Sequence, residues 1–330
     1  MKRVLKVAQF GLGPIGQECL KLVATKPWAR VVGAIDSDPA KVGKDIRALC
    51  GIPHLKPLRV CGAVPELREK PDLIFHTAVS RLDSAFSQLV PILARGINIV
   101  SSCEELLFPQ LRWPRLAARL QVACRRSGAR LLGTGVNPGF VMDLLPLVLS
   151  GVTRRIDAIH VQRVVNASTR RKPLQTKIGS SLAPEEFRRL FRTGKAGHAG
   201  LKESVALIVH ALGYRIKSIR SIIETGDAIV AAKPIETAFL RVRRGQTCGL
   251  HQRAEACIPG GPRISLDLKM YLDANNPHDA IQIEGDPPLD LLVRGGIAGD
   301  PATVAALVNA APRLMRMPPG LRLISELPAG

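Results

Sequence analysis

The 330-residue sequence has little of what marks membrane, disulfide-stabilised or metal-binding proteins. No apolar run reaches the ~18–20 residues that a membrane-spanning helix needs. The seven cysteines are odd in number and show neither a CxxC pair nor zinc-ligand spacing, so we expect reduced thiols and no metal site. We therefore expect a cytoplasmic protein, not bound to a membrane, with room for two domains.

Aromatic residues make up only 4% of the chain, which leaves few stacking platforms for nucleic-acid bases. The formal charge of +20 is nevertheless the electrostatic signature of nucleic-acid binding. The basic residues, however, are spread in short groups, and the sequence has no helix-turn-helix, zinc or RNA-binding motif. We expect no nucleic-acid partner, and a basic, NAD-sensing, nucleic-acid-binding regulator is the non-enzymatic alternative.

A glycine-rich turn follows the first apolar run. The residues VLKVAQF at 4–10 predict a buried strand, and GLGPIG at 11–16 predicts a turn that opens a helix. Gly11 would make the tight turn, Gly13 would let the backbone approach a pyrophosphate, and Gly16 would let the helix lie close to the strand. The helix N-terminus would bind the phosphates. This pattern predicts a dinucleotide-binding domain.

An acidic residue follows the second predicted strand, which spans residues 28–35. Asp36 stands where an acid typically accepts hydrogen bonds from the ribose hydroxyls of NAD. Ser37, Lys41 and Lys44 could instead hold the 2′-phosphate of NADP, so the sequence leaves the cofactor open between NAD and NADP. The structural alternative is an ordinary βα turn in which Asp36 caps the next turn.

Further strands are predicted at 72–79, 97–102 and 129–134, with helices between them, which favours a Rossmann-type doubly wound parallel sheet. Glu104 and Glu105 follow the strand at 97–102, where ligands bind in an open α/β sheet. One of them could face substrate and nicotinamide, or both could simply be first-turn acids of a helix. The turn that contains Asn137 follows the strand at 129–134, and Asn137 could equally be an ordinary helix-entry residue.

From residue 156 the pattern changes to extended, alternating segments that predict a mostly antiparallel sheet, interrupted by helices at 184–192 and 200–212. A late helix is predicted at 304–309, with Asp300 as its N-cap and Pro301 at its first position. The fold class that we predict is α/β, with a second α+β domain. Its expected boundaries are 1–135, completed by about 296–330, for the dinucleotide-binding domain and 136–295 for substrate binding and dimerisation.

Several motifs together resemble the family of 2,4-diaminopentanoate dehydrogenase and the native amine dehydrogenases, which are similar in design to dihydrodipicolinate reductase. They are GLGPIG, SSCEEL (101–106), GVNPGFVMD (135–143), NASTRR (166–171), GHAGLKES (197–204) and GGIAGD (295–300). The resemblance spans nearly the whole chain. It implies NAD(P)H-dependent reductive amination of a ketone or aldehyde with ammonia, and a homodimer formed through the sheet of the second domain.

The resemblance also implies a set of site residues, with Glu104 as the catalytic carboxylate. Val141 and Thr169 depart from some relatives, which leaves the carbonyl substrate open. The expected substrate-binding residues are Asn137, Phe140, Val141, Asn166, Thr169 and His198. The expected cofactor-binding residues are Gly11, Gly13, Pro14, Ile15, Gly16, Asp36, Ser37, Ala78, Ser102 and Cys103.

Two other enzyme classes share this layout. A semialdehyde dehydrogenase would use Cys103 as nucleophile and His198 as base, although the adjacent Glu104 discourages thiolate formation. An imine reductase of the dihydrodipicolinate reductase type would be expected to carry a KxDAPSGT motif, which this sequence lacks.

Overall fold

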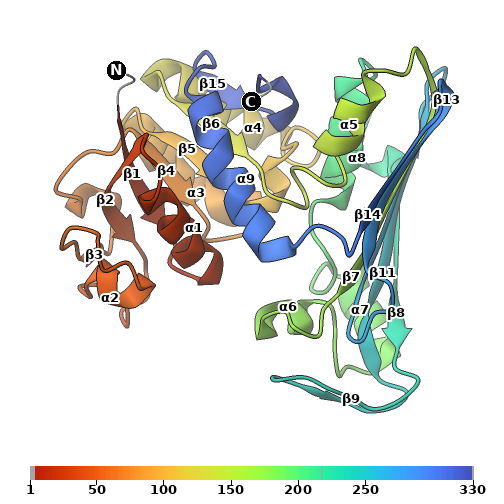
Figure 1. Ribbon diagram of the computed structural model, residues 1–330. Helices are drawn as coiled ribbons and strands as arrows, with labels where there is room; N and C mark the ends of the chain where they lie inside the picture. The colour runs from red at the N-terminus through yellow and green to blue at the C-terminus, as the bar shows by residue number, and fades with distance from the viewer. Residues whose placement is uncertain (1–3, 217, 329–330) are drawn as a thin grey trace. The chain divides into compact units, whose positions relative to one another are not determined.

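The computed structural model describes residues 4–216 and 218–328, and the contacts of the chain divide it into two units. The first unit runs to Phe140 and resumes at Ala298, and the second unit is Val141–Ile297. Each unit has its own sheet and its own helices (Figure 1).

Seven strands form the sheet of the first unit, and every neighbouring pair is parallel. The expected parallel sheet is therefore confirmed. Its central strands are short apolar runs that are buried on both faces, as parallel strands usually are. In spatial order the strands are β15 (Gly320–Arg322), β6 (Arg130–Gly133), β5 (Asn98–Ser101), β4 (Leu73–His76), β1 (Leu5–Phe10), β2 (Ala29–Ile35) and β3 (Val60–Cys61).

Helices cover both faces of this sheet, which makes it doubly wound. Helix α1 (Pro14–Ala24) packs beside α9 (Gly299–Leu314), and Figure 1 shows the two in red and blue on one face. Helix α3 (Leu82–Ala94) packs beside α4 (Pro114–Ser127), and their buried side chains form one core cluster with residues of β1, β4, β5 and β6. This core fixes the carboxyl ends of the strands, where the candidate site lies.

The C-terminal segment completes the first unit, because β15 extends the sheet beyond β6. The helix before it begins earlier than the sequence indicates. Helix α9 starts at Gly299 with Ala298 as its N-cap, so the prediction of Asp300 as N-cap is wrong by two residues. Pro301 still lies in the first turn, where its missing N–H breaks no helical hydrogen bond.

Six strands form the sheet of the second unit, and only β7 and β12 pair in parallel, so the expected mostly antiparallel sheet is confirmed. Helix α7 (Pro184–Arg192) packs on β8, and α8 (Leu201–Ala211) packs on β11 and β12. In spatial order the strands are β14 (Leu289–Arg294), β13 (His278–Asp286), β7 (Arg155–Asn166), β12 (Arg263–Tyr271), β11 (Thr247–Cys257) and β8 (Ile223–Val230).

The remaining elements are short, and most of them have no counterpart in the sequence predictions. Strands β13 and β14 also escaped prediction, although β13 is an inner strand, paired with β14 on one side and β7 on the other. Within the described residues, no helix is long and apolar enough to cross a membrane. The short elements are α2 (Ile46–Cys50), α5 (Leu144–Ser150), α6 (Lys172–Lys177), β9 (Ile235–Glu236), β10 (Arg241–Val242), and the 3-10 turns η1 (Val64–Glu66), η2 (Glu104–Leu106), η3 (Ile219–Ser221) and η4 (Ile324–Glu326).

Candidate functional site

The turn between β1 and α1 is built by glycines that make different contacts. Gly11 has a φ of +88°, and a Cβ on it would lie 3.1 Å from the backbone of Ala78. A Cβ on Gly16 would collide with the carbonyl oxygen of Gly11, so only glycine lets α1 start this close to the turn. A Cβ on Gly13 would meet nothing within 4 Å, which leaves room in front of the helix N-terminus. Pro14 and Ile15 then form the first turn of α1.

Two polar side chains that the sequence analysis missed hold the carbonyl of Gly11. The buried Gln9 donates from Nε2 to that oxygen at 3.1 Å and to Thr77 Oγ1 at 2.8 Å. Thr77 Oγ1 in turn donates to the same oxygen at 3.1 Å. The signal in the sequence was a glutamine at the buried end of a mostly apolar strand, since a buried polar side chain needs hydrogen-bond partners.

Asp36 follows β2 and accepts three hydrogen bonds. Its donors are Leu12 N at 2.6 Å, Asp38 N at 2.9 Å and Lys41 Nζ at 3.2 Å. Burial alone would raise the pKa of this carboxyl, but the two N–H groups and the Lys41 ammonium lower it overall. A negative charge is thus held beside the glycine turn, and Ser37 follows it as an exposed residue.

The two glutamates after β5 occupy different environments. Glu105 is buried, and its Oε2 accepts from Leu82 N and from Trp113 Nε1, both at 2.8 Å. Its Oε1 lies 3.4 Å from Arg112 Nε. Glu104 is only half-buried and begins the 3-10 turn η2. Glu105 therefore fastens this turn to the starts of α3 and α4.

The environment of Cys103, directly before Glu104, tests whether this thiol could act as the nucleophile of a semialdehyde dehydrogenase. Burial raises the pKa of the Cys103 thiol, and the nearby carboxylates raise it further. Its Sγ lies 3.3 Å from Ser80 O, to which it donates. A thiol held in this way is a poor nucleophile, which argues against a semialdehyde dehydrogenase. Ser102 is half-buried, and its N–H donates to His76 O at 2.9 Å.

The loop from 134 to 140 leaves the sheet next to the Glu104 turn. Gly133 pairs with Ser101, and a Cβ on it would collide with the backbone of Leu106. In this loop the amide Nδ2 and Oδ1 of Asn137 are both buried and lack a hydrogen-bond partner. A buried amide with unmet hydrogen bonds is costly unless a ligand meets them. Phe140, at the end of the loop, is 37% exposed.

The expected substrate-binding residues from Val141 onward lie in the second unit. Val141 is fully buried and Thr169 is exposed. The side chain of Asn166 donates from Nδ2 to Ala274 O and accepts at Oδ1 from Ser168 N. His198 has a buried Nε2 without a partner. Burial, with Lys177 and Arg163 nearby, lowers the pKa of His198 to about 3, so its ring is neutral at pH 7.

The backbone of His198 is held by a single side chain. Gln252 accepts from His198 N at 2.8 Å and donates to His198 O at 2.9 Å, so one amide binds both backbone groups. A second bond from Gln252 Nε2 goes to Glu224 Oε1 at 2.9 Å. The His198 backbone is thus fixed to β11 while its ring keeps an unused nitrogen.

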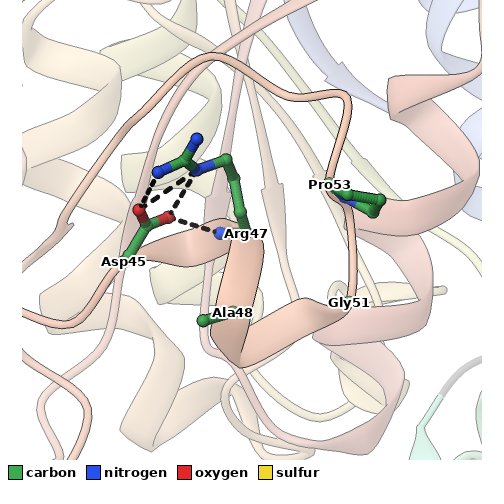
Figure 2. A pocket seen from close by; sticks show the side chains of 5 residues that line it. All are labelled: Asp45, Arg47, Ala48, Gly51 and Pro53. Atoms are coloured by element: carbon green, nitrogen blue, oxygen red, sulfur yellow. Dashed lines mark hydrogen bonds and ion pairs between the residues drawn. The ribbon is translucent and has the colours of Figure 1, made fainter.

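A separate surface hollow lies beside α2 and is lined by Asp45, Arg47, Ala48, Gly51 and Pro53. Figure 2 shows that the Asp45 carboxylate and the Arg47 guanidinium bind each other there. None of the expected site residues lines it. Within residues 4–216 and 218–328, no group of three or more His, Cys, Asp or Glu side chains is arranged to hold a metal ion.

Comparisons with known proteins agree over most of the chain. The family model described as 2,4-diaminopentanoate dehydrogenase C-terminal domain matches residues 140–330. The 2,4-diaminopentanoate dehydrogenase of Acetoanaerobium sticklandii is 25% identical over 337 residues, covering 98% of this chain and 93% of that protein. The amine dehydrogenase of Streptomyces virginiae is 23% identical over 355 residues, covering 98% and 96%. The solved structure of amine dehydrogenase from Mycobacterium smegmatis matches with a TM-score of 0.87 and 24% identity, covering 98% and 96%.

Proposed function

Because the chain belongs to the 2,4-diaminopentanoate dehydrogenase family, by its C-terminal domain, we propose that it is an NAD(P)-dependent amine dehydrogenase. It acts on CH–NH2 groups and catalyses the reversible reductive amination of a ketone or aldehyde with ammonia. Its partners are a small carbonyl compound or the corresponding amine, together with ammonia. The observation that supports the catalytic assignment is the position of Glu104, a half-buried carboxylate that follows β5 at the carboxyl edge of the parallel sheet, where ligands bind in this architecture.

Glu104 supplies the acid–base chemistry that amination needs. Ammonia must add to the carbonyl, water must leave, and the resulting iminium must be reduced. A carboxylate can bind ammonium, accept a proton from it before the attack, return a proton to the departing hydroxyl and stabilise the cationic iminium. Bound NAD(P)H supplies the hydride. Asn137 offers a donor and an acceptor that the surrounding protein leaves unpaired, which supports a role in orienting the carbonyl or the nicotinamide amide.

The first unit fits a dinucleotide. The space in front of Gly13 and the N-terminus of α1 suit a pyrophosphate, and the Asp36 carboxylate suits the ribose hydroxyls. Lys41, which could otherwise hold the 2′-phosphate of NADP, is paired with Asp36 and Asp38. This favours NAD. The backbone of Ala78 packs against Gly11 of the turn. Ser37, Ser102 and Cys103 are the other residues that we propose to contact the cofactor.

In the second unit, we propose that the substrate contacts Val141, Asn166, Thr169 and His198. We also propose a dinucleotide-binding domain of residues 1–135 with 296–330 and a substrate domain of residues 136–295. The division of the contacts after Phe140 and before Ala298 supports these limits. A cytoplasmic location is supported by the seven cysteines, all described and all free thiols. A homodimer formed through the sheet of the second unit is part of the proposal, and its solution mass by light scattering is the measurement that tests it.

The activity is tested by following NADH and NADPH oxidation with a panel of small ketones and aldehydes, with and without concentrated ammonia at alkaline pH. We expect ammonia-dependent oxidation, and a fall of about 10²–10⁴-fold in kcat for Glu104→Gln. Glu185→Gln, at a surface glutamate, serves as the matched control. Oxidation that needs no ammonia would identify a carbonyl reductase instead, and near-normal turnover of a folded Glu104→Gln enzyme would remove Glu104 from the mechanism.

A further inference from the structure

A buried histidine that the proposed mechanism does not use lies at the end of β4, next to the strand that leads to Glu104. The His76 side chain has no exposed surface, and its ring lies 5.2 Å from the Phe10 ring between centroids. Its Nδ1 is 2.9 Å from Ser101 Oγ, and its Nε2 is 2.8 Å from Gln88 Oε1. A buried titratable ring with two specific partners invites a functional explanation.

The hydrogen bonds around this ring have a consistent direction. The N–H of Cys103 can only donate, so Ser101 Oγ accepts from it, at 3.1 Å. The hydroxyl proton of Ser101 is then available to Nδ1 of His76, and Nε2 carries the ring proton toward the oxygen of Gln88. Burial lowers the pKa of His76, which keeps the ring neutral and able to accept at Nδ1. The relay thus runs from Cys103 N–H through Ser101 and His76 to Gln88.

This chain of hydrogen bonds begins at Cys103, the residue directly before the proposed catalytic carboxylate. The residue on the other side, Glu105, is bound to Leu82 N and Trp113 Nε1. Glu104 itself therefore sits between two neighbours that are both fastened to other elements of the sheet and helices. An error of about 1 Å in the place of a catalytic group can cost on the order of 100-fold in rate.

We propose that His76 is a positioning residue for amination, which acts through Ser101 and the Cys103 N–H to fix the backbone that carries Glu104. The inference rests on the proposed function, because it assigns His76 a role only through Glu104. It predicts that the bond to Ser101 matters for turnover and that the bond to Gln88 matters only for holding the ring.

Two amide substitutions at His76 distinguish the contribution of the bond to Ser101 from that of the bond to Gln88. The amide of His76→Asn reaches the place of Nδ1 and can still accept from Ser101, whereas the longer amide of His76→Gln reaches the place of Nε2 and loses that bond. We expect kcat for reductive amination to fall about 100-fold in His76→Gln and to stay within about fivefold of wild type in His76→Asn. Ser101→Ala removes the same link from the other side and should match His76→Gln.

A double-mutant cycle with Glu104→Gln shows whether the effect passes through the carboxylate. If it does, His76→Gln causes no further loss in the Glu104→Gln background, whereas general damage to the fold lowers the rate in both backgrounds. Thermal unfolding and far-UV circular dichroism identify variants that do not fold, and Ser101→Ala then replaces His76→Gln in the cycle. Equal losses for the Asn and Gln variants, or additive losses in the cycle, would overturn this inference alone. A wild-type rate in Glu104→Gln would overturn the proposed catalytic role as well.

Discussion

Replacing Asp279 with alanine should destabilise the second unit strongly, because this carboxylate is the partner of a buried arginine. Asp279 on β13 pairs in register with Arg163 on β7, and the two side chains are 1% and 3% exposed. Arg163 Nη1 donates to both carboxylate oxygens at 2.6 and 2.7 Å. The pair also holds Ile297, the last residue of the second unit, through Ile297 N to Asp279 Oδ2 at 2.7 Å and Arg163 Nη2 to Ile297 O at 2.8 Å.

The expected loss of stability follows from the buried charges and unpaired hydrogen-bonding groups that remain in each variant. Asp279→Ala leaves a buried guanidinium without its counter-ion, which costs about 3–5 kcal/mol in comparable cases. The double variant Arg163→Met with Asp279→Leu removes both charges, and replacing a whole buried pair is often close to neutral. It still leaves the N–H and C=O of the half-buried Ile297 without these partners, although the single variant loses the partner of the N–H as well. We therefore expect the double variant to be more stable than the single one and less stable than wild type.

Hydrogen exchange of the β7 and β13 amides, detected by mass spectrometry, measures the free energy of opening of these two strands. Both tryptophans, Trp28 and Trp113, lie in the first unit, so tryptophan fluorescence would follow the other sheet. The free energy of opening for these strands should fall by about 3–5 kcal/mol in Asp279→Ala. A fall below about 1 kcal/mol, or a double variant no more stable than the single one, would refute the reasoning.

Two further predictions concern the cofactor and the pH dependence of stability. Asp36→Ser frees Lys41 from its main partner, so the ratio of kcat/KM for NADPH to that for NADH should rise by about 10–100-fold, and an unchanged ratio would count against Asp36 as the selecting residue. The pKa of His198 is lowered to about 3 in the folded chain, whereas a histidine in the unfolded chain has a pKa near 6.5. Between pH 3 and pH 6.5, His198 is therefore protonated in the unfolded chain and neutral in the folded chain. The free energy of unfolding should therefore fall as pH falls through this window, by at most about 1.4 kcal/mol per pH unit, and urea unfolding at several pH values should show a shallower dependence in His198→Gln. Equal slopes in both proteins would contradict the burial of a neutral ring.

The sequence was informative where local pattern and tertiary environment agree. Strands β1 and β2 of the first unit are mostly apolar and are followed directly by Gly11 and Asp36, and both sheets have the predicted character. The resemblance to the amine dehydrogenase family is confirmed as well. The missed elements have physical reasons. Strand β3 is two residues long and helix α6 is six, which is too short for a periodic pattern. At α9, the Asp-Pro signal lies inside the first turn because the helix begins two residues earlier.

The candidate site marks the limit of such reasoning most clearly at Glu104 and Glu105. The two residues are adjacent and chemically identical, so position, charge and helix-dipole arguments apply to both alike. What separates them is the set of donors that faces Glu105, and those donors come from Leu82 and Trp113, at the starts of two helices. His76 shows the same dependence on packing, since its partner Ser101 belongs to the neighbouring strand. A pattern in one segment can predict that carboxylates stand at the sheet edge, but only the packing of the other segments shows that Glu105 fastens two helix starts.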